Sequence, residues 1–272
     1  MKELCVAVVS SMSTFCDVDA NLDHFESLVE RASGGGARLV CFPELALTSY
    51  TTDPSVLKVA EAVPGPSTDR LARVALSHNV YLSVGMAEKD GDHHYITQIV
   101  VGPDGYVGKY RKHHLAGPGE QGGFSRGSSY PVFDVDGFRL GINICYDGRF
   151  PDTIEAMREA KVDVIHHPHG NWIEGLGKDA EEWTRGKLVY FVSRAVRARA
   201  YILINNSAGD TPHPGGVDQF GSGALIIDPL GQVVERTIEE TRGEKMIWAT
   251  LVKPLSEFVP DFELKRLEAD GG

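Results

Sequence analysis

Long hydrophobic runs are missing from this chain of 272 residues, and their absence excludes helices that cross a membrane. A bilayer-spanning helix needs roughly 20 consecutive apolar residues, and no run in the sequence approaches that length. The opening residues, MKELCV, contain an early acid and lack the apolar segment and cleavage site of a secretion signal. We therefore expect a cytoplasmic protein without a membrane partner.

Positive charge is also scarce. The chain has 27 Lys and Arg against 38 Asp and Glu, a formal net charge of −11. Proteins that bind nucleic acid usually carry a basic face, so we expect no nucleic-acid partner. Linkers, charge blocks and low-complexity tracts are absent, and a hydrophobic content of 42% suffices for a full-sized core. Residues 1–272 are therefore predicted to form a single domain.

Cysteine is rare and forms no metal-binding or redox pair. In a chain without a secretion signal, Cys5, Cys16, Cys41 and Cys145 are expected to be free thiols. Cys5 and Cys41 fit buried positions in apolar strands, and Cys16 lies in a loop with no helper nearby. Cys145 follows the apolar run Leu140–Ile144 and precedes a helix, where backbone N–H groups favour an anion. It is either a candidate nucleophile or another small buried residue.

Apolar strands alternate with amphipathic helices along the chain. Two of the expected helices are Asn21–Ala32 and Ser67–Ser77. A third begins at a capping box formed by Asp152 and Glu155 and ends near Ala160. A longer fourth helix ends at Val196. The expected strands are Leu4–Val9, Arg38–Phe42, Val80–Met86, Tyr95–Val101, Tyr106–Tyr110, Phe138–Ile144, Val162–His166, Tyr201–Ile204, Ala224–Ile227 and Met246–Leu251. This order indicates an α/β layered sandwich in which helices cover the sheet faces.

Two charged residues at strand ends complete a reactive set with Cys145. Glu44 follows one strand and Lys112 follows another, and α/β sheets usually build their sites at such ends. Taken alone, each fits a solvated loop residue. Together, Glu44 can accept a thiol proton and Lys112 can stabilise an oxyanion. Because all three lie at the ends of strands of one sheet system, we expect them to converge.

Three segments resemble the motifs of the nitrilase superfamily, the carbon–nitrogen hydrolases. Phe42–Tyr50 resembles the first motif, Tyr110–Leu115 the second and Asn143–Pro151 the third. Their order matches the family, and the resemblance extends to the turn Asp228–Gly231. Three motifs in order are a far more specific signal than any single match.

This resemblance implies a four-layer α-β-β-α sandwich of the nitrilase type. It further implies Cys145 as nucleophile, Glu44 as general base and Lys112 as oxyanion donor. Members often carry a second active-site glutamate between the lysine and the cysteine, and Glu120 matches that position. The family also implies a homodimer or a dimer of dimers, a small-molecule substrate, and neither a cofactor nor a metal.

The sequence departs from the family pattern at two places. Arg197 stands where many relatives have an acid, which predicts a changed salt bridge near the site or the dimer surface. After the strand that follows Cys145, the run His166–Trp172 is more polar than in relatives. We expect His167 and three substrate-binding residues, His169, Asn171 and Trp172, at the mouth of the site, joined by Tyr146 after the nucleophile. The alternative is that these polar side chains only satisfy one another.

The predicted substrate is a small polar aliphatic amide, hydrolysed through a thioester. The segment Cys145–Pro151 resembles amide-hydrolysing branches, whereas nitrile-hydrolysing relatives more often have Trp-Glu where this chain has Tyr146 and Asp147. N-carbamoyl (ureido) hydrolases stay open as the first alternative and nitrilases as the second. A polar pocket favours a hydrogen-bonding substrate, because unpaired buried polar groups reject an apolar one.

Two other classes of protein compete with this interpretation. A metal-dependent hydrolase would use the cluster His166–His169 with Asp163 or Glu174 as a further ligand. Pro168 interrupts that cluster, and no HExxH or HxxxH spacing occurs in the chain. A non-catalytic binding protein with the same fold is the other alternative, and the presence of all three catalytic residue types disfavours it.

Overall fold

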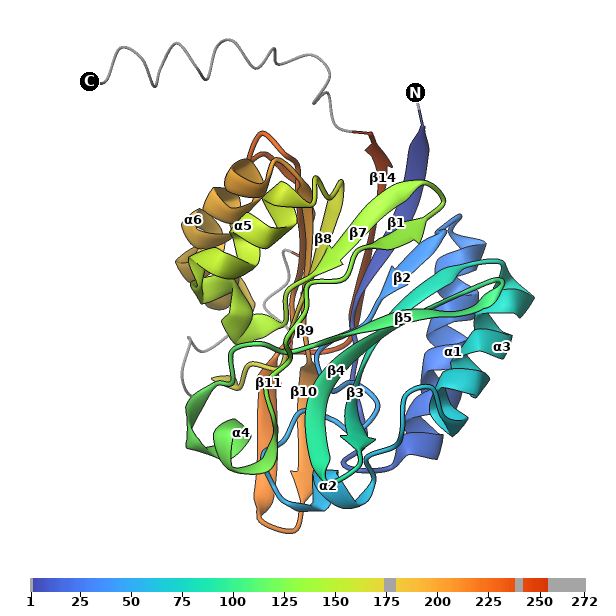
Figure 1. The fold of residues 1–272 in the computed structure, drawn as a ribbon, viewed down its shortest axis with the longest axis vertical. Helices are drawn as coiled ribbons and strands as arrows, with labels where there is room; N and C mark the ends of the chain where they lie inside the picture. The colour runs from blue at the N-terminus through green and yellow to red at the C-terminus, as the bar shows by residue number, and fades with distance from the viewer. Residues whose placement is uncertain (1, 174–179, 238–241, 254–272) are drawn as a thin grey trace.

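The computed structural model of the chain describes residues 2–173, 180–237 and 242–253, with the side chains of α6 described from residue 187 onward. Two six-stranded sheets lie face to face, and helices cover the outer face of each sheet (Figure 1). In the described part of the chain, no helix is long and apolar enough to cross a membrane.

The first sheet has the order β14-β1-β2-β3-β4-β5. Its strands are β1 (Glu3–Ser10), β2 (Leu39–Cys41), β3 (Tyr81–Asp90), β4 (His93–Gly102), β5 (Gly105–Arg111) and β14 (Lys245–Val252). β1, β2 and β3 run parallel, while β14, β4 and β5 add antiparallel edges. The helices α1 (Val18–Gly34) and α3 (Pro66–His78) cover its outer face, and the short α2 spans Ser55–Lys58.

The second sheet has the order β13-β12-β9-β8-β7-β6. Its strands are β6 (Phe133–Val135), β7 (Phe138–Ile142), β8 (Val164–His169), β9 (Tyr201–Asn206), β12 (Ala224–Ile227) and β13 (Val233–Arg236). The helices α5 (Pro151–Glu159) and α6 (Ala180–Ala198) cover it. Shorter elements are α4 (Gly117–Gly123), the 3-10 helix η1 (Cys145–Arg149) and a separate hairpin of β10 (Ala208–His213) and β11 (Gly216–Gly221).

Three hydrophobic layers hold these elements together. The strand β1 contributes side chains to two of them. Its side chains alternate, so Val6 and Val8 enter the layer between the two sheets while Ala7 and Val9 pack outward against α1. The third layer joins α5 and α6 to the second sheet, with Phe191 fully buried in it. Helix, sheet, sheet and helix thus form four layers, and the predicted α-β-β-α sandwich is confirmed.

Some local predictions were wrong. The strands that carry the three candidate catalytic residues belong to two sheets, with Glu44 and Lys112 following strands of the first and Cys145 following a strand of the second. The predicted capping box of α5 does not form, because the Asp152 carboxylate instead contacts His114 Nε2 and the Tyr130 hydroxyl, both at 3.0 Å.

Candidate active site

Cys145 is the first residue of η1, directly beyond the end of β7. Its φ of +43° lies in the left-handed region, which residues with a Cβ rarely occupy and which is common at functional sites. The residue is partly exposed at the wall of a pocket of about 840 Å³. A cavity of this size suits a small molecule.

A buried ammonium group acts electrostatically on Cys145. Lys112 Nζ donates to Glu44 Oε1 at 2.6 Å and to Glu120 Oε1 at 2.8 Å, and all three side chains are almost completely buried. Burying a charge costs several kcal/mol unless it is paired. Burial would lower the pKa of Lys112, but Glu44 and Glu120 hold it above its ordinary value, so this lysine is a cation.

The position of Glu44 is fixed by close packing between its own backbone segment and a neighbouring strand. The segment around it lies against Gly85 of β3, where a Cβ would collide with the backbone of Pro43 and Leu45. Burial raises the pKa of Glu44 to about 7, against the lowering effect of Lys112. Its second oxygen, Oε2, makes no hydrogen bond within the described residues. That oxygen is therefore available to accept a proton.

Glu120 is as firmly held, although it lies in a glycine-rich segment. Its Oε1 also accepts a hydrogen bond from Tyr50 Oη at 2.7 Å, and its Oε2 accepts one from the Ala116 N–H at 2.7 Å. These bonds lock the carboxylate that holds Lys112. Only 1% of Glu120 is exposed, so this glutamate is part of the buried site.

The thiol of Cys145 behaves differently from the sequence-based expectation. Close packing around the sulfur raises its pKa to about 12, and Glu44 adds to the shift, while Lys112 and Lys187 oppose it. We expected the start of a helix to favour the anion, but η1 is a single short turn beside buried carboxylates. The resting group is therefore a protonated thiol, which must lose its proton to a base before it can act as a nucleophile.

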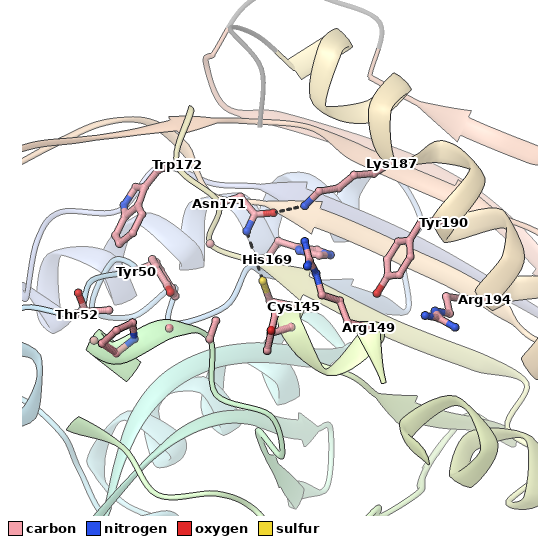
Figure 2. Close-up of a pocket in the computed structure, with 16 residues that line it drawn as sticks. Tyr50, Thr52, Cys145, Arg149, His169, Asn171, Trp172, Lys187, Tyr190 and Arg194 are labelled. Atoms are coloured by element: carbon pink, nitrogen blue, oxygen red, sulfur yellow. Dashed lines mark hydrogen bonds between the residues drawn. The ribbon is translucent and has the colours of Figure 1, made fainter. Parts of the chain in front are cut away.

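The pocket gathers all four residues predicted to bind substrate. Tyr146 lines it, together with His169, Asn171, Trp172 and Cys145 (Figure 2). His167, also expected at the mouth, is absent from the described lining. It is buried, and its Nδ1 donates to the Asn143 carbonyl oxygen at 2.6 Å.

Asn171 connects the nucleophile to α6. Its Nδ2 lies 3.4 Å from Cys145 Sγ, and its Oδ1 accepts a hydrogen bond from Lys187 Nζ at 3.0 Å (Figure 2). Asn206 Oδ1 and Nδ2 hold the backbone of Asn171 at 2.7 and 3.1 Å. Neither Lys187 nor Arg149, which also lines the pocket, was identified from sequence. The available signal for Lys187 was its spacing from Tyr190 and Arg194, which places the three residues on one face of a helix.

The histidine cluster is engaged in structural contacts. His166 lies between Ser83 Oγ at 2.9 Å and Asn205 Oδ1 at 3.1 Å. Burial lowers the pKa of His166 to about 3 and that of His167 to about 4, so both are neutral near pH 7. Among the described residues no group of three potential ligands is placed to hold a metal. Glu174, a suggested ligand, lies outside them.

The departure at Arg197 lies away from the pocket. Its guanidinium bonds Glu155 Oε1 at 2.8 Å and so joins α6 to α5 on an exposed surface. The changed salt bridge, expected near the site or the dimer surface, therefore lies on the helical outer layer and not at the pocket.

Comparison with known proteins places the chain in a family. The carbon–nitrogen hydrolase family profile matches residues 5–257. A nitrilase from Pyrococcus abyssi is 38% identical over 60% of this chain, an alignment that spans 63% of that relative's length. Omega-amidase NIT2 of Bos taurus is 30% identical over 90% of this chain and 89% of its own length.

The fold has close counterparts among solved structures. An amidase from Nesterenkonia sp. superposes with a TM-score of 0.79 at 22% identity, covering 97% of this chain and 95% of that one. With a family match that covers nearly the whole sequence, the chain belongs to the carbon–nitrogen hydrolases of the nitrilase superfamily, and the prediction of a carbon–nitrogen hydrolase is confirmed.

Proposed function

We propose that this hydrolase is an amidase that acts on a small polar aliphatic amide through a thioester on Cys145. The observation that carries the proposal is the Lys112 ammonium, fully buried between Glu44 and Glu120. Because the Lys112 ammonium group is shielded from solvent, it cannot interact with bulk water or with another molecule at the protein surface. It is a preorganised charge beside a thiol, as stabilisation of an oxyanion requires.

Each step uses a group whose state follows from its surroundings. Glu44, with a pKa near 7, accepts the thiol proton as Cys145 Sγ attacks the amide carbon. Lys112 Nζ and a backbone N–H near Tyr146 stabilise the tetrahedral oxyanion. Glu44 returns the proton to the departing nitrogen, ammonia leaves, and a thioester remains. Water activated by Glu44 then hydrolyses the thioester, releasing the acid and restoring the thiol.

Glu120 is proposed to position Lys112 and to balance its charge. Tyr146, His169, Asn171 and Trp172 are proposed to bind the substrate, because they surround the pocket next to the nucleophile. Asn171 Nδ2, near the sulfur, can orient the amide. Polar groups at these positions support a hydrogen-bonding substrate over an apolar one.

A screen for ammonia release tests the substrate class. Amides, N-carbamoyl compounds and nitriles with the same side chain are compared at equal concentration, with Cys145→Ala as the blank. We expect amides to have the highest kcat/KM. A preference of tenfold or more for nitriles or N-carbamoyl compounds would reject the amide assignment and leave the thioester mechanism in place.

We also propose that residues 1–272 form one domain that assembles as a homodimer or a dimer of dimers. The pairing of β1 with β14 joins the two ends of the described chain in one sheet, which supports a single domain. On α6, Val189 and Val196 are 81% and 49% exposed and lie seven residues apart on one face, which supports an interface. Sedimentation that shows only a monomer at micromolar concentration would reject the assembly.

A further inference from the structure

Two polar side chains lie in the apolar layer between the two sheets. Side chains alternate along a strand, so His166 shares with Val164 the face of β8 that meets the first sheet, and Asn205 shares that face of β9 with Leu203. Val164 and Leu203 belong to the apolar packing of the layer, whereas His166 and Asn205 are polar and fully buried. Burying a polar group costs free energy unless it is hydrogen-bonded, so both side chains need partners inside the layer.

Asn205 connects the second sheet to two strands of the first. Its Nδ2 donates to the carbonyl oxygen of Val9 on β1 at 2.7 Å and to that of Cys41 on β2 at 2.9 Å. Its Oδ1 lies 3.1 Å from His166 Nε2. Because both partners of Nδ2 are acceptors, the amide has only one favourable orientation, and its single acceptor oxygen faces the histidine.

His166 extends this connection to β3. Burial lowers the pKa of His166 to about 3, so the ring is neutral, and its one N–H, at Nε2, donates to Asn205. Nδ1 therefore accepts a hydrogen bond from the Ser83 hydroxyl at 2.9 Å. Ser83 faces the same layer, because Leu82 and Val84 on either side of it pack on the outer face of the sheet. We call Asn205, His166 and Ser83 the polar bridge.

The polar bridge joins the two strand ends that carry Glu44 and Cys145. On the first sheet, the carbonyl group of Cys41 that it binds lies three residues before Glu44. On the second sheet, the carbonyl oxygen of His166 accepts the N–H of Asn143 at 3.0 Å, and Asn143 lies two residues before Cys145. The bridge therefore connects the base and the nucleophile of the proposed reaction across the interface between the sheets.

Apolar packing alone would define this interface loosely. The hydrophobic effect has no directional preference, so apolar faces can shift against one another at low cost. Hydrogen bonds require a narrow range of distances and angles, and a buried network in which every group is paired makes its surroundings rigid. Rigidity matters here, because a misplacement of about 1 Å between reacting groups can lower a rate by about 10².

We propose that the polar bridge positions Glu44 of the first sheet against Cys145 of the second for transfer of the thiol proton. Asn205 and His166 are thus positioning residues, since neither lines the described pocket and both act through the strands that they join. The inference rests on the proposed thioester mechanism. Loss of the bridge should slow the chemical step and leave substrate binding in place, so kcat should fall with little change in KM.

Asn205→Leu and Asn21→Leu are a matched pair of variants. Asn21 is also a buried asparagine whose Nδ2 donates to two carbonyl oxygens, those of Thr14 and Leu47 at 2.8 and 2.9 Å, but it lies on α1 and joins no strand of the second sheet. Both variants should lower Tm, because each leaves two carbonyl groups without their donor. Only Asn205→Leu should also lower kcat, by about tenfold or more. An equal fall of kcat in both variants would overturn the inference.

Two further substitutions test whether the bridge acts as one unit. His166→Phe keeps a ring in the layer and removes both hydrogen bonds of the imidazole. Combined with Asn205→Leu, it should lower kcat no further than the more affected single variant, because both changes break the same connection. Multiplied effects would contradict a single bridge. Ser83→Ala removes only the hydroxyl group and should lower kcat less, so it keeps the test available where the larger changes prevent folding.

Alkylation of Cys145 by iodoacetamide provides a measurement that needs no turnover. A sulfur–carbon bond forms, iodide leaves and the thiol proton passes to Glu44, and mass spectrometry follows the carbamidomethyl group on the peptide that contains Cys145. Glu44→Gln gives the rate without the base. Asn205→Leu and Ser83→Ala should approach that rate, and Asn21→Leu should stay near the wild-type rate.

This measurement separates failure of the bridge from failure of the proposed function. If amides are not hydrolysed but alkylation follows the expected order, the amidase function is rejected and the positioning of Glu44 against Cys145 is supported. Alkylation of Asn205→Leu at the wild-type rate would overturn the inference. Equal rates in Glu44→Gln and the wild type would overturn it as well, because the proton transfer that the bridge serves would then be absent.

Discussion

The carboxylate of Asp147 accepts a hydrogen bond from the backbone N–H of His114, with 2.7 Å between Oδ1 and N. The same oxygen accepts the N–H of His113 at 3.1 Å, and Oδ2 accepts the N–H of Ile144 at 3.0 Å and the Tyr110 hydroxyl at 2.7 Å. The first two amides directly follow Lys112, and the third precedes Cys145. One buried carboxylate therefore joins the segment after the lysine to the turn that carries the nucleophile.

Asp147→Asn should weaken this connection between the segment after Lys112 and the turn that carries Cys145. A carboxamide has one acceptor oxygen in place of two, so at least one buried N–H loses its partner, which costs about 1–3 kcal/mol. We expect Tm to fall by several degrees and kcat to fall about tenfold or more, with a smaller change in KM. Thermal melting and steady-state kinetics measure both effects. Tyr110→Phe, which removes only one donor from the same carboxylate, should have a weaker effect.

Turnover should depend on pH through Glu44. Its pKa is raised to about 7, and a base must be deprotonated to accept the thiol proton, so kcat/KM should rise with pH through about 7. Glu44→Gln should lower kcat by about 10² or more and remove this acid limb. Glu44→Asp keeps a carboxylate and should keep the limb at reduced kcat. An unchanged limb in Glu44→Gln would assign it to another group.

Lys112→Ala should lower kcat by about 10² or more through loss of the oxyanion donor. It also removes the charge that opposes the raised pKa of Glu44, so the acid limb of any residual activity should move to higher pH. The matched control is Lys109→Ala on β5, the strand that Lys112 follows, because Lys109 contacts Glu88 and the Val63 carbonyl. If Lys109→Ala lost turnover while Lys112→Ala kept it, the assignment of the lysine would be wrong.

Glu120→Gln tests positioning through Lys112. The amide would keep a neutral contact with Lys112 and Tyr50 but remove one of the two negative charges that hold the ammonium. We expect a fall in kcat of about tenfold or more with a smaller change in KM, and an acid limb at lower pH, since Glu120 contributes to the raised pKa of Glu44. Tyr50→Phe retains the charge and should leave the limb in place.

Most of the strands and the positions of the three candidate catalytic residues were predictable because their signals are local. The β1 region is a continuous apolar run, Glu44 and Cys145 each follow such a run, and Lys112 follows β5 within a recognisable motif. The partition into two sheets was not predictable in this way. It depends on pairings between distant segments, such as β1 with β14, which no local pattern encodes.

The missed elements have weak or contrary sequence signals. β10 contains a glycine, an aspartate and a proline, which are depleted in strands. All four residues of β13 are exposed, so that strand shows no alternation of buried and exposed side chains. The raised pKa of the Cys145 thiol was not predictable for a related reason. Its pKa follows from packing by Glu44 and other residues distant in sequence, whereas the sequence shows only the short turn that follows β7.

The central claim is that Cys145 carries the acyl group of the substrate, and mass spectrometry of the enzyme quenched during turnover tests it most directly. A slowly hydrolysed amide should increase the protein mass by that of the amide minus ammonia. Peptide mapping should place the group on Cys145 and leave Cys5, Cys16 and Cys41 unmodified, and Cys145→Ala should neither acquire it nor release ammonia. An acyl group on another residue, or ammonia release by Cys145→Ala at the wild-type rate, would contradict the account.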